Sequence, residues 1–207
     1  FYGNGLKVGN GNYNSVGNLE VRYCTMTFGQ NLTSENVAYY NQANQFVKIN
    51  GVPGTPYASV VVENNYVSGT PVANVYPIQL WDVDNAVVRN NKMDLSNAAD
   101  HQAIGVSKMA TDATVEISGN VISGAGGGIY VTTWLLGGNN ADTKETFTGT
   151  ITVQGNQLTC AESNTMFPVY IGYENSNAPL WLAGRCPDGQ RQHQQGFYCR
   201  RKNRQRS

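Results

Sequence analysis

The chain has 207 residues, and its 14 acidic and 14 basic residues leave no net charge at neutral pH. Charged residues make up only 14% of the chain, and Gly occupies 23 positions. No apolar run reaches the roughly 18 residues that a membrane-spanning helix needs. The composition therefore excludes a helical membrane span and favours an all-β chain that is rich in turns.

One short pattern recurs along the chain: apolar, any, any, Asn, any, apolar. An early copy, Val21–Met26, carries Cys24 at the Asn position, and a late copy, Leu182–Arg185, carries Arg185 there. Between them lie four complete copies whose Asn residues are 26, 29 and 36 positions apart: Asn65, Asn91, Asn120 and Asn156. A repeat of this period predicts structural units that stack on one another.

A second series of segments alternates apolar, polar or small, and apolar residues, which is the periodicity of a strand with one buried face. The series continues at nearly constant distance from each Asn, except that the interval after Asn120 shrinks to nine residues. A tight turn at Gly124–Gly128 would explain that shorter interval. The members of the series are Leu6–Val8, Val47–Ile49, Ile78–Leu80, Ile104–Val106, Ile129–Val131 and Val169–Ile171.

A unit of 26 to 29 residues holds about three short strands and three turns. Stacking such units gives a parallel β-helix, in which each strand pairs with its copy in the next coil. We expect about five to six coils over residues 1–184. The chain starts at Phe1, within a coil, which predicts a fragment of a longer solenoid.

The repeated Asn residues are interpreted as a structural ladder. Asn tolerates the left-handed backbone conformation that a sharp bend needs, so we expect that conformation at these positions. Stacked amides can also donate and accept hydrogen bonds along the column. Cys24 fits this column as a small buried thiol. Ligand binding by the column is the alternative interpretation.

Outward positions beside the ladder carry Arg22, Glu63 and Arg89, a pattern that predicts charge pairing between coils. Cys24 and Cys160 are expected several coils apart, too far for a disulfide. The chain has no Cys or His spacing typical of a metal site, and we predict no metal and no cofactor.

Residues 185–207 differ from the rest of the chain. They hold seven of the 14 Lys and Arg residues and one acid, Asp188, and carry almost no aliphatic side chain. Such a segment buries too little apolar surface to order itself, so we expect a disordered basic tail, or residues foreign to this fold. A basic arm that binds nucleic acid or another anionic surface is the alternative, although no specific nucleic-acid site is visible.

The strand–turn repeats with their Asn ladder resemble the right-handed parallel β-helix of the pectate-lyase-like superfamily, over roughly residues 1–184. The resemblance implies an extracellular, cell-surface, periplasmic or virion location and extracellular polysaccharides as ligands. It also implies either a homotrimer, as in tailspikes, or end-to-end continuation of the solenoid. The Asn-Thr-Asp, Gly-His-Gly and Arg-Ile-Lys motifs of polygalacturonase-like hydrolases do not occur in the chain.

Alignment of the second series predicts one candidate site, because it places Asp82, Lys108, Thr133 and Tyr173 at one level of successive coils. Asp82 or Asp84 would supply a carboxylate, and Lys108 a base or a stabilising charge. Aromatic faces beside carboxylates suit sugar rings. The residues expected to contact such a ligand are Trp81, Trp134, Tyr173 and Glu174. An exposed Asp82–Lys108 ion pair with no ligand is the structural alternative.

Two functions follow. The first is a non-catalytic, structural and carbohydrate-binding segment of a secreted, surface or phage-tail protein. The second is a polysaccharide lyase, glycoside hydrolase or uronan epimerase, for which Ca²⁺ is the expected cofactor only if the reaction is a lyase reaction. The three candidate catalytic residues fall short of a complete site, so the sequence favours the first function.

Overall fold

A computed structural model gives the conformation of most of the repeat region. It describes residues 6–8, 17–28, 45–51, 57–69, 76–109, 112–133, 148–159, 161 and 167–173. The predicted boundary at residue 184 and the predicted tail at 185–207 lie outside these residues, as do the Arg185 copy of the repeat and three of the four cysteines.

Every regular element in the described part of the chain is a β-strand. Most strands are three to five residues long, whereas β9 has 18 residues and β11 has 13. The strands are β1 (Leu6–Val8), β2 (Asn18–Arg22), β3 (Thr25–Phe28), β4 (Val47–Asn50), β5 (Ser59–Glu63), β6 (Tyr66–Gly69), β7 (Ile78–Trp81), β8 (Asn85–Arg89), β9 (Lys92–Met109), β10 (Thr114–Ser118), β11 (Val121–Thr133), β12 (Thr150–Gln154), β13 (Gln157–Thr159) and β14 (Val169–Tyr173).

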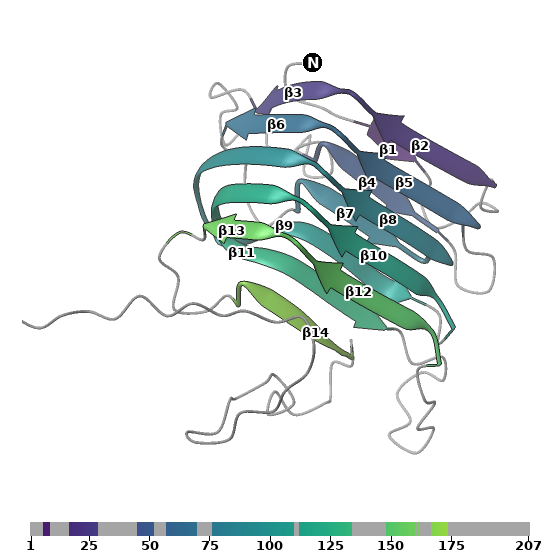
Figure 1. Cartoon of the computed structure of the whole chain (residues 1–207). Helices are drawn as coiled ribbons and strands as arrows, with labels where there is room; N and C mark the ends of the chain where they lie inside the picture. The colour runs from purple at the N-terminus through teal and green to yellow at the C-terminus, as the bar shows by residue number, and fades with distance from the viewer. Residues whose placement is uncertain are drawn as a thin grey trace, which may run out of the picture.

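The strands form two parallel sheets. A five-stranded sheet has the order β12-β10-β8-β5-β2, and its strands lie side by side in Figure 1. The second sheet has nine strands and bends, because β9 and β11 each belong to two rows. The first residues of β9 pair with β6 and its last residues pair with β7. Likewise, the first residues of β11 pair with β13 and its last residues pair with β14. The described chain is therefore all-β, with each strand paired to one from the next repeat.

The strand register confirms the pairing predicted from both series. In the five-stranded sheet, Val62 stands between Val21 and Val88. In the nine-stranded sheet, Ile78 stands between Val47 and Ile104. Because the side-chain period of a strand is two, this register keeps the same face of every strand turned inward.

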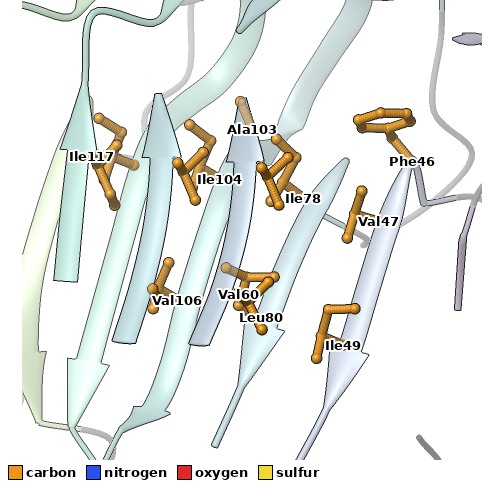
Figure 2. Close-up of a cluster of buried hydrophobic side chains, with 14 of the residues drawn as sticks. Phe46, Val47, Ile49, Val60, Ile78, Leu80, Ala103, Ile104, Val106 and Ile117 are labelled. Carbon is orange, nitrogen blue, oxygen red and sulfur yellow. The ribbon is translucent and has the colours of Figure 1, made fainter. Parts of the chain in front are cut away.

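The core consists of the inward side chains of both sheets. Figure 2 shows these side chains in rows on three neighbouring strands: Val47 and Ile49 on β4, Ile78 and Leu80 on β7, and Ile104 and Val106 on β9. All six are fully buried. Rows of branched aliphatic side chains on adjacent strands fill the interior and supply most of the apolar burial that stabilises a stacked fold.

The backbone at the Asn corners differs from the prediction. The left-handed conformation lies one residue before each column position, at Tyr23 before Cys24 and at Asn64, Asn90, Gly119 and Gly155 before the four repeated Asn, with φ between 54° and 63°. The repeated Asn positions themselves have no positive φ. The bend is thus made by the preceding residue, and the Asn side chain is left to form hydrogen bonds.

The prediction of a tight turn at Gly124–Gly128 is wrong. These residues belong to β11, where the ladder with β9 continues through Ala125 and Gly127 with two register shifts. Gly124 has a φ of +78°, and a Cβ at this position would collide with the main-chain oxygen of Leu95. Glycine therefore lets the strand bend close to its neighbour without breaking the ladder.

Candidate functional site

The repeated Asn side chains form one buried hydrogen-bonded column. Asn65 donates from Nδ2 to Oδ1 of Asn91 at 2.9 Å, Asn91 to Asn120 at 3.0 Å, and Asn120 to Asn156 at 2.9 Å. Each Oδ1 acceptor also receives the main-chain N–H of the Asn in the preceding repeat. Both lone pairs of these oxygens are consequently used, which leaves no acceptor for a ligand.

The second Nδ2 hydrogen of each Asn bonds to the main chain of the preceding repeat. Asn91, for example, donates to the carbonyl oxygen of Val62 at 2.9 Å, and Asn156 donates to that of Ile117 at 2.8 Å. At the other end of the column, the main-chain N–H of Cys24 donates to Oδ1 of Asn65 at 2.9 Å. The column has a direction, because each side chain accepts from the repeat before it.

Asp82 lies in the corner that follows β7. Its φ is +52°, and the residue is 9% exposed. Its main-chain oxygen accepts a hydrogen bond from Tyr57 at 3.1 Å, and its main-chain N–H donates to Ser107 at 3.4 Å. A Cβ at Gly51 would collide with Asp82, so the glycine makes room for this corner. The local geometry holds Asp82 as part of the bend between repeats.

Asp84 is half-buried and lies two residues further on. Burial raises the pKa of its carboxyl above the ordinary value, and the negative charge of the exposed Asp112 raises it further. Val83, the residue between the two predicted acids, is fully buried and forms an isolated parallel β-bridge with Tyr57. The electrostatic neighbour of Asp84 is therefore another acid, which disfavours its charged form.

The predicted alignment of Lys108 with Thr133 is wrong by one residue. Val131 pairs with Val106, but Thr133 pairs with Met109, so β9 contains one extra residue between these two pairs. On the other side, Trp81 pairs with Ser107, and the main-chain N–H of Asp82 donates to the main-chain oxygen of Ser107, the residue before Lys108. The side chain of Lys108 lies outside the described part of the structure. A bulge of this kind re-aims the side chains at the end of a strand.

The predicted aromatic residues are described in part. Trp81 is half-buried on the outer face of β7, and the Lys48 ammonium lies over its ring at 5.6 Å from the centroid. The main chain of Tyr173 pairs with Thr133, as expected. The Tyr173 side chain, Trp134 and Glu174 lie outside the described residues. The structure therefore places one aromatic residue of the predicted cluster.

Three tyrosines that the sequence analysis did not select form a strip on this same outer face, and we call it the tyrosine strip: Tyr76, Tyr130 and Tyr170. The Tyr76 and Tyr130 rings stack at 5.9 Å, and the Tyr130 and Tyr170 rings stack at 5.1 Å. These centroid separations exceed the contact distance of about 3.5–4.0 Å between ring carbons. The rings are therefore offset, and all three tyrosines are half-buried.

The strand pairing explains how the strip forms. Tyr130 stands between Gly105 and Tyr170 in the register of the sheet. A Cβ at Gly105 would approach the Tyr76 ring to 2.9 Å, so the ring lies over this glycine and reaches Tyr130. For Tyr130 and Tyr170 the available signal was the middle position of an apolar–any–apolar triplet, whereas Tyr76 lies two residues before its triplet.

A second group that sequence reasoning missed lies on β6, β9 and β11. The Tyr66 hydroxyl donates to Oδ2 of Asp94 at 3.0 Å, and the Lys92 ammonium lies 3.2 Å from the same oxygen. The Ser123 hydroxyl donates to the other carboxylate oxygen at 3.2 Å. These residues occupy the first and third positions after the repeated Asn, an outward pattern visible in the sequence.

The surroundings of Asp94 control its ionisation. Partial burial acts to raise the pKa of the Asp94 carboxyl, but the hydrogen bond and charge of Lys92, with the hydrogen bonds from Tyr66 and Ser123, outweigh it. The pKa consequently lies below its ordinary value. Asp94 is a carboxylate at neutral pH, held by neighbours from three adjacent strands.

The predicted charge pairing on the five-stranded sheet is confirmed. Glu63 is buried and accepts from Nε of Arg22 at 3.2 Å and from Nε of Arg89. The Arg89 guanidinium has a raised pKa because of its hydrogen bond and charge interaction with Glu63. Each oxygen of the Glu63 carboxylate serves one arginine, so the three residues form a cross-strand structural network.

Within the described ranges, no three His, Cys, Asp or Glu side chains gather closely enough to hold a metal ion. In the same residues, no helix has the length and apolarity to cross a membrane. Comparison with models of protein families, with curated proteins and with solved structures found no match. A proposal for the function of this chain therefore has to be based on the geometry of its described residues.

Proposed function

We propose that this chain is a non-catalytic segment of a secreted, cell-surface or phage-tail protein, and that it binds an extracellular polysaccharide along the tyrosine strip. The scaffold we propose is a right-handed parallel β-helix. Parallel pairing of strands from successive repeats supports it, since connections between parallel strands are right-handed in about 98% of cases. The fold alone does not decide the ligand, which depends on the outer faces.

The observation that carries the proposal is the offset stacking of Tyr76, Tyr130 and Tyr170. The strip crosses neighbouring strands, so its three half-buried rings follow one another along the direction in which the repeats stack. Sugar rings place C–H faces on aromatic rings and hydrogen-bond through their hydroxyls. An extended polysaccharide fits such a linear arrangement better than a compact ligand does.

The arrangement of the acids supports the non-catalytic assignment. Asp82 is built into a corner, and the pKa of Asp84 is raised by burial and by Asp112. Paired-carboxylate glycosidases need two carboxyl groups that flank one bond with different pKa values and an open space between them. Val83, which separates these two acids in the sequence, is fully buried, and Asp82 is only 9% exposed.

The test is a glycan-array screen of the full chain and of two matched variants. Tyr130→Ala removes the central ring of the strip. Tyr23→Ala removes a tyrosine that is 79% exposed at a corner before β3. We expect Tyr130→Ala to weaken retention about tenfold or more, since aromatic contacts dominate such sites, and Tyr23→Ala to bind like the wild type. Absence of any retained glycan, or equal binding by Tyr130→Ala and the wild type, would refute the proposal.

A second candidate function is polysaccharide cleavage, and the Tyr66–Lys92–Asp94 group favours it. The Lys92 ammonium and the Tyr66 phenol each lie within hydrogen-bonding distance of the Asp94 carboxylate, and such groups can take part in acid–base catalysis. Glycans retained in the screen would be incubated with the protein, with and without Ca²⁺, and assayed for unsaturated uronate and new reducing ends. Turnover that Asp94→Asn, Asp82→Ala or Lys108→Ala abolishes would make the protein an enzyme and would name its site.

A further inference from the structure

The last strands of the two sheets form an edge, which we call the C-terminal edge: β12, β13 and β14. Within the described residues, β12 pairs only with β10, and β13 and β14 pair only with β11. The main-chain N–H of Thr150 and the main-chain oxygen of Gln154 bond toward β10. By the alternation of a parallel ladder, the main-chain groups of Ile151 and Val153 face away from β10.

The core is open at this edge. Ile151 and Val153 are only half-buried, whereas their partners Val115 and Ile117 on β10 are at most 1% exposed. The other sheet shows the same difference in burial, because Ile171 is 38% exposed and its partner Val131 is fully buried. These side chains occupy core positions, and among the described residues no further layer packs over them as one does in the interior repeats.

The Asn column ends at this edge with unpaired donors. Oδ1 of Asn156 accepts two hydrogen bonds from Asn120, and one Nδ2 hydrogen bonds to Ile117. In the preceding repeats, the main-chain N–H and the other Nδ2 hydrogen converge on the Oδ1 of the next Asn. At Asn156 both donors point to the next layer, and no acceptor lies there among the described residues.

The next layer must also supply a donor. Each column residue donates to a main-chain oxygen one repeat back: Asn120 to Val88, and Asn156 to Ile117. Val153 pairs with Ile117 and so presents the corresponding oxygen at the edge. In the interior repeats an Asn carboxamide does both, accepting from the Asn before it and donating to the main chain, whereas a carboxylate has no hydrogen to donate.

We propose that the C-terminal edge binds a strand–turn–strand segment of another polypeptide, added in parallel register with an asparagine in the Asn column. Strand addition of this kind pairs the free main-chain groups of an edge and seats alternate side chains on the core. In a second copy of the described residues stacked head to tail, the first column position would be Cys24, whose thiol has no amide oxygen. The chain's own segment Leu182–Arg185 would bring a guanidinium, which only donates.

The experiment measures binding of a labelled peptide to the full chain by fluorescence anisotropy. The peptide copies residues 114–122, which hold one strand, the corner with Asn120 and the start of the next strand. A second peptide carries Leu in place of Asn120. We expect saturable binding of the first peptide and about tenfold or weaker binding of the second, since Leu leaves buried donors unpaired.

Two chain variants locate the binding. Ile151→Lys places a charge on the inward row at the C-terminal edge, and Leu19→Lys places one on the same row at the opposite edge, since both positions align through Val60, Ala86 and Val115. We expect Ile151→Lys to abolish binding and Leu19→Lys to retain it. Circular dichroism and thermal unfolding verify that each variant is folded, and Asn156→Leu serves in place of Ile151→Lys if the latter unfolds.

Three results would overturn the proposal. One is the absence of saturable peptide binding, and another is equal binding of the two peptides. The third is self-association in sedimentation velocity that Ile151→Lys removes, because the edge would then take a second copy of this chain.

Discussion

The Asn column and the tyrosine strip lie on the same repeats but follow different rules. In the column, every interior repeat uses the same residue and the same hydrogen bonds, at 2.9–3.1 Å. On the outer face of β4, β7, β9, β11 and β14, the equivalent position changes from repeat to repeat: Lys48, Gln79, Gly105, Tyr130 and Tyr170. The buried corner requires one chemistry, whereas the outer position accepts residues that range from the buried Gln79 to the half-buried Tyr130.

The largest expected effect comes from breaking the column at its centre. Asn91→Ala removes a side chain that accepts two hydrogen bonds from Asn65 and donates to Val62 and Asn120. We expect a loss of about 3–5 kcal/mol in the free energy of unfolding, because several buried groups become unpaired at once. Denaturant titration followed by circular dichroism measures it.

A matched control uses an asparagine outside the column. Asn85 is exposed, and its Nδ2 donates only to the main-chain oxygen of Ala58. Asn85→Ala should cost about 1 kcal/mol or less, as for one ordinary hydrogen bond. Similar losses in the two variants would contradict the distinction between the column and the surface.

An intermediate effect is expected in the tyrosine strip. Gly105→Ala brings a methyl group to within 2.9 Å of the Tyr76 ring and forces it to shift. We expect a loss of about 1 kcal/mol in the free energy of unfolding from this overpacking, together with weaker glycan retention. A double-mutant cycle with Tyr76→Ala isolates the cause, because Gly105→Ala should cost little once the ring is absent. An unchanged cost in the double variant would place the strain elsewhere.

The smallest effect concerns Asp84, whose raised pKa means that the fold disfavours its charge. That penalty is fully present above the folded-state pKa and disappears as the pH falls below the unfolded value of about 3.8. Asp84→Asn should therefore raise the midpoint of thermal unfolding at neutral pH, with the gain vanishing in acid.

Asp94 serves as a control, because its pKa is shifted in the direction opposite to that of Asp84. Its pKa is lowered, so its charge stabilises the fold above the unfolded-state value, and this contribution is lost as the pH falls through the folded-state value. Asp94→Asn should lower the midpoint of thermal unfolding at neutral pH and have little effect in strong acid. Shifts of the same sign in the two variants would refute the assigned environments.

The sequence predicts the stacking well, because the periods of two residues within strands and of 26 or more between repeats are both direct consequences of pairing and burial. The corner was assigned one residue too late. Its signal was present, since Asn64, Asn90, Gly119 and Gly155 precede the repeated Asn and both residue types tolerate positive φ.

The candidate site was harder to predict. The extra residue in β9 between Val106 and Met109 shifts the alignment of Lys108, and a bulge leaves no clear mark in a single sequence. Tyr130 and Tyr170 stood in triplets that were used only to assign strands. A glycine such as Gly105 decides which outward side chains come into contact, because it leaves room for the Tyr76 ring. This effect can be recognised only once the pairing of the strands is known.

The unequal spacing of the repeats has a consequence for how this chain tolerates insertions. Consecutive column residues are 26, 29 and 36 positions apart, yet they form hydrogen bonds of nearly the same length. The entropy of closing a loop grows only with the logarithm of its length, so the step from 26 to 36 residues costs about 0.3 kcal/mol. New segments can therefore enter between strands at almost no thermodynamic cost, provided that the corner and the inward rows keep their register.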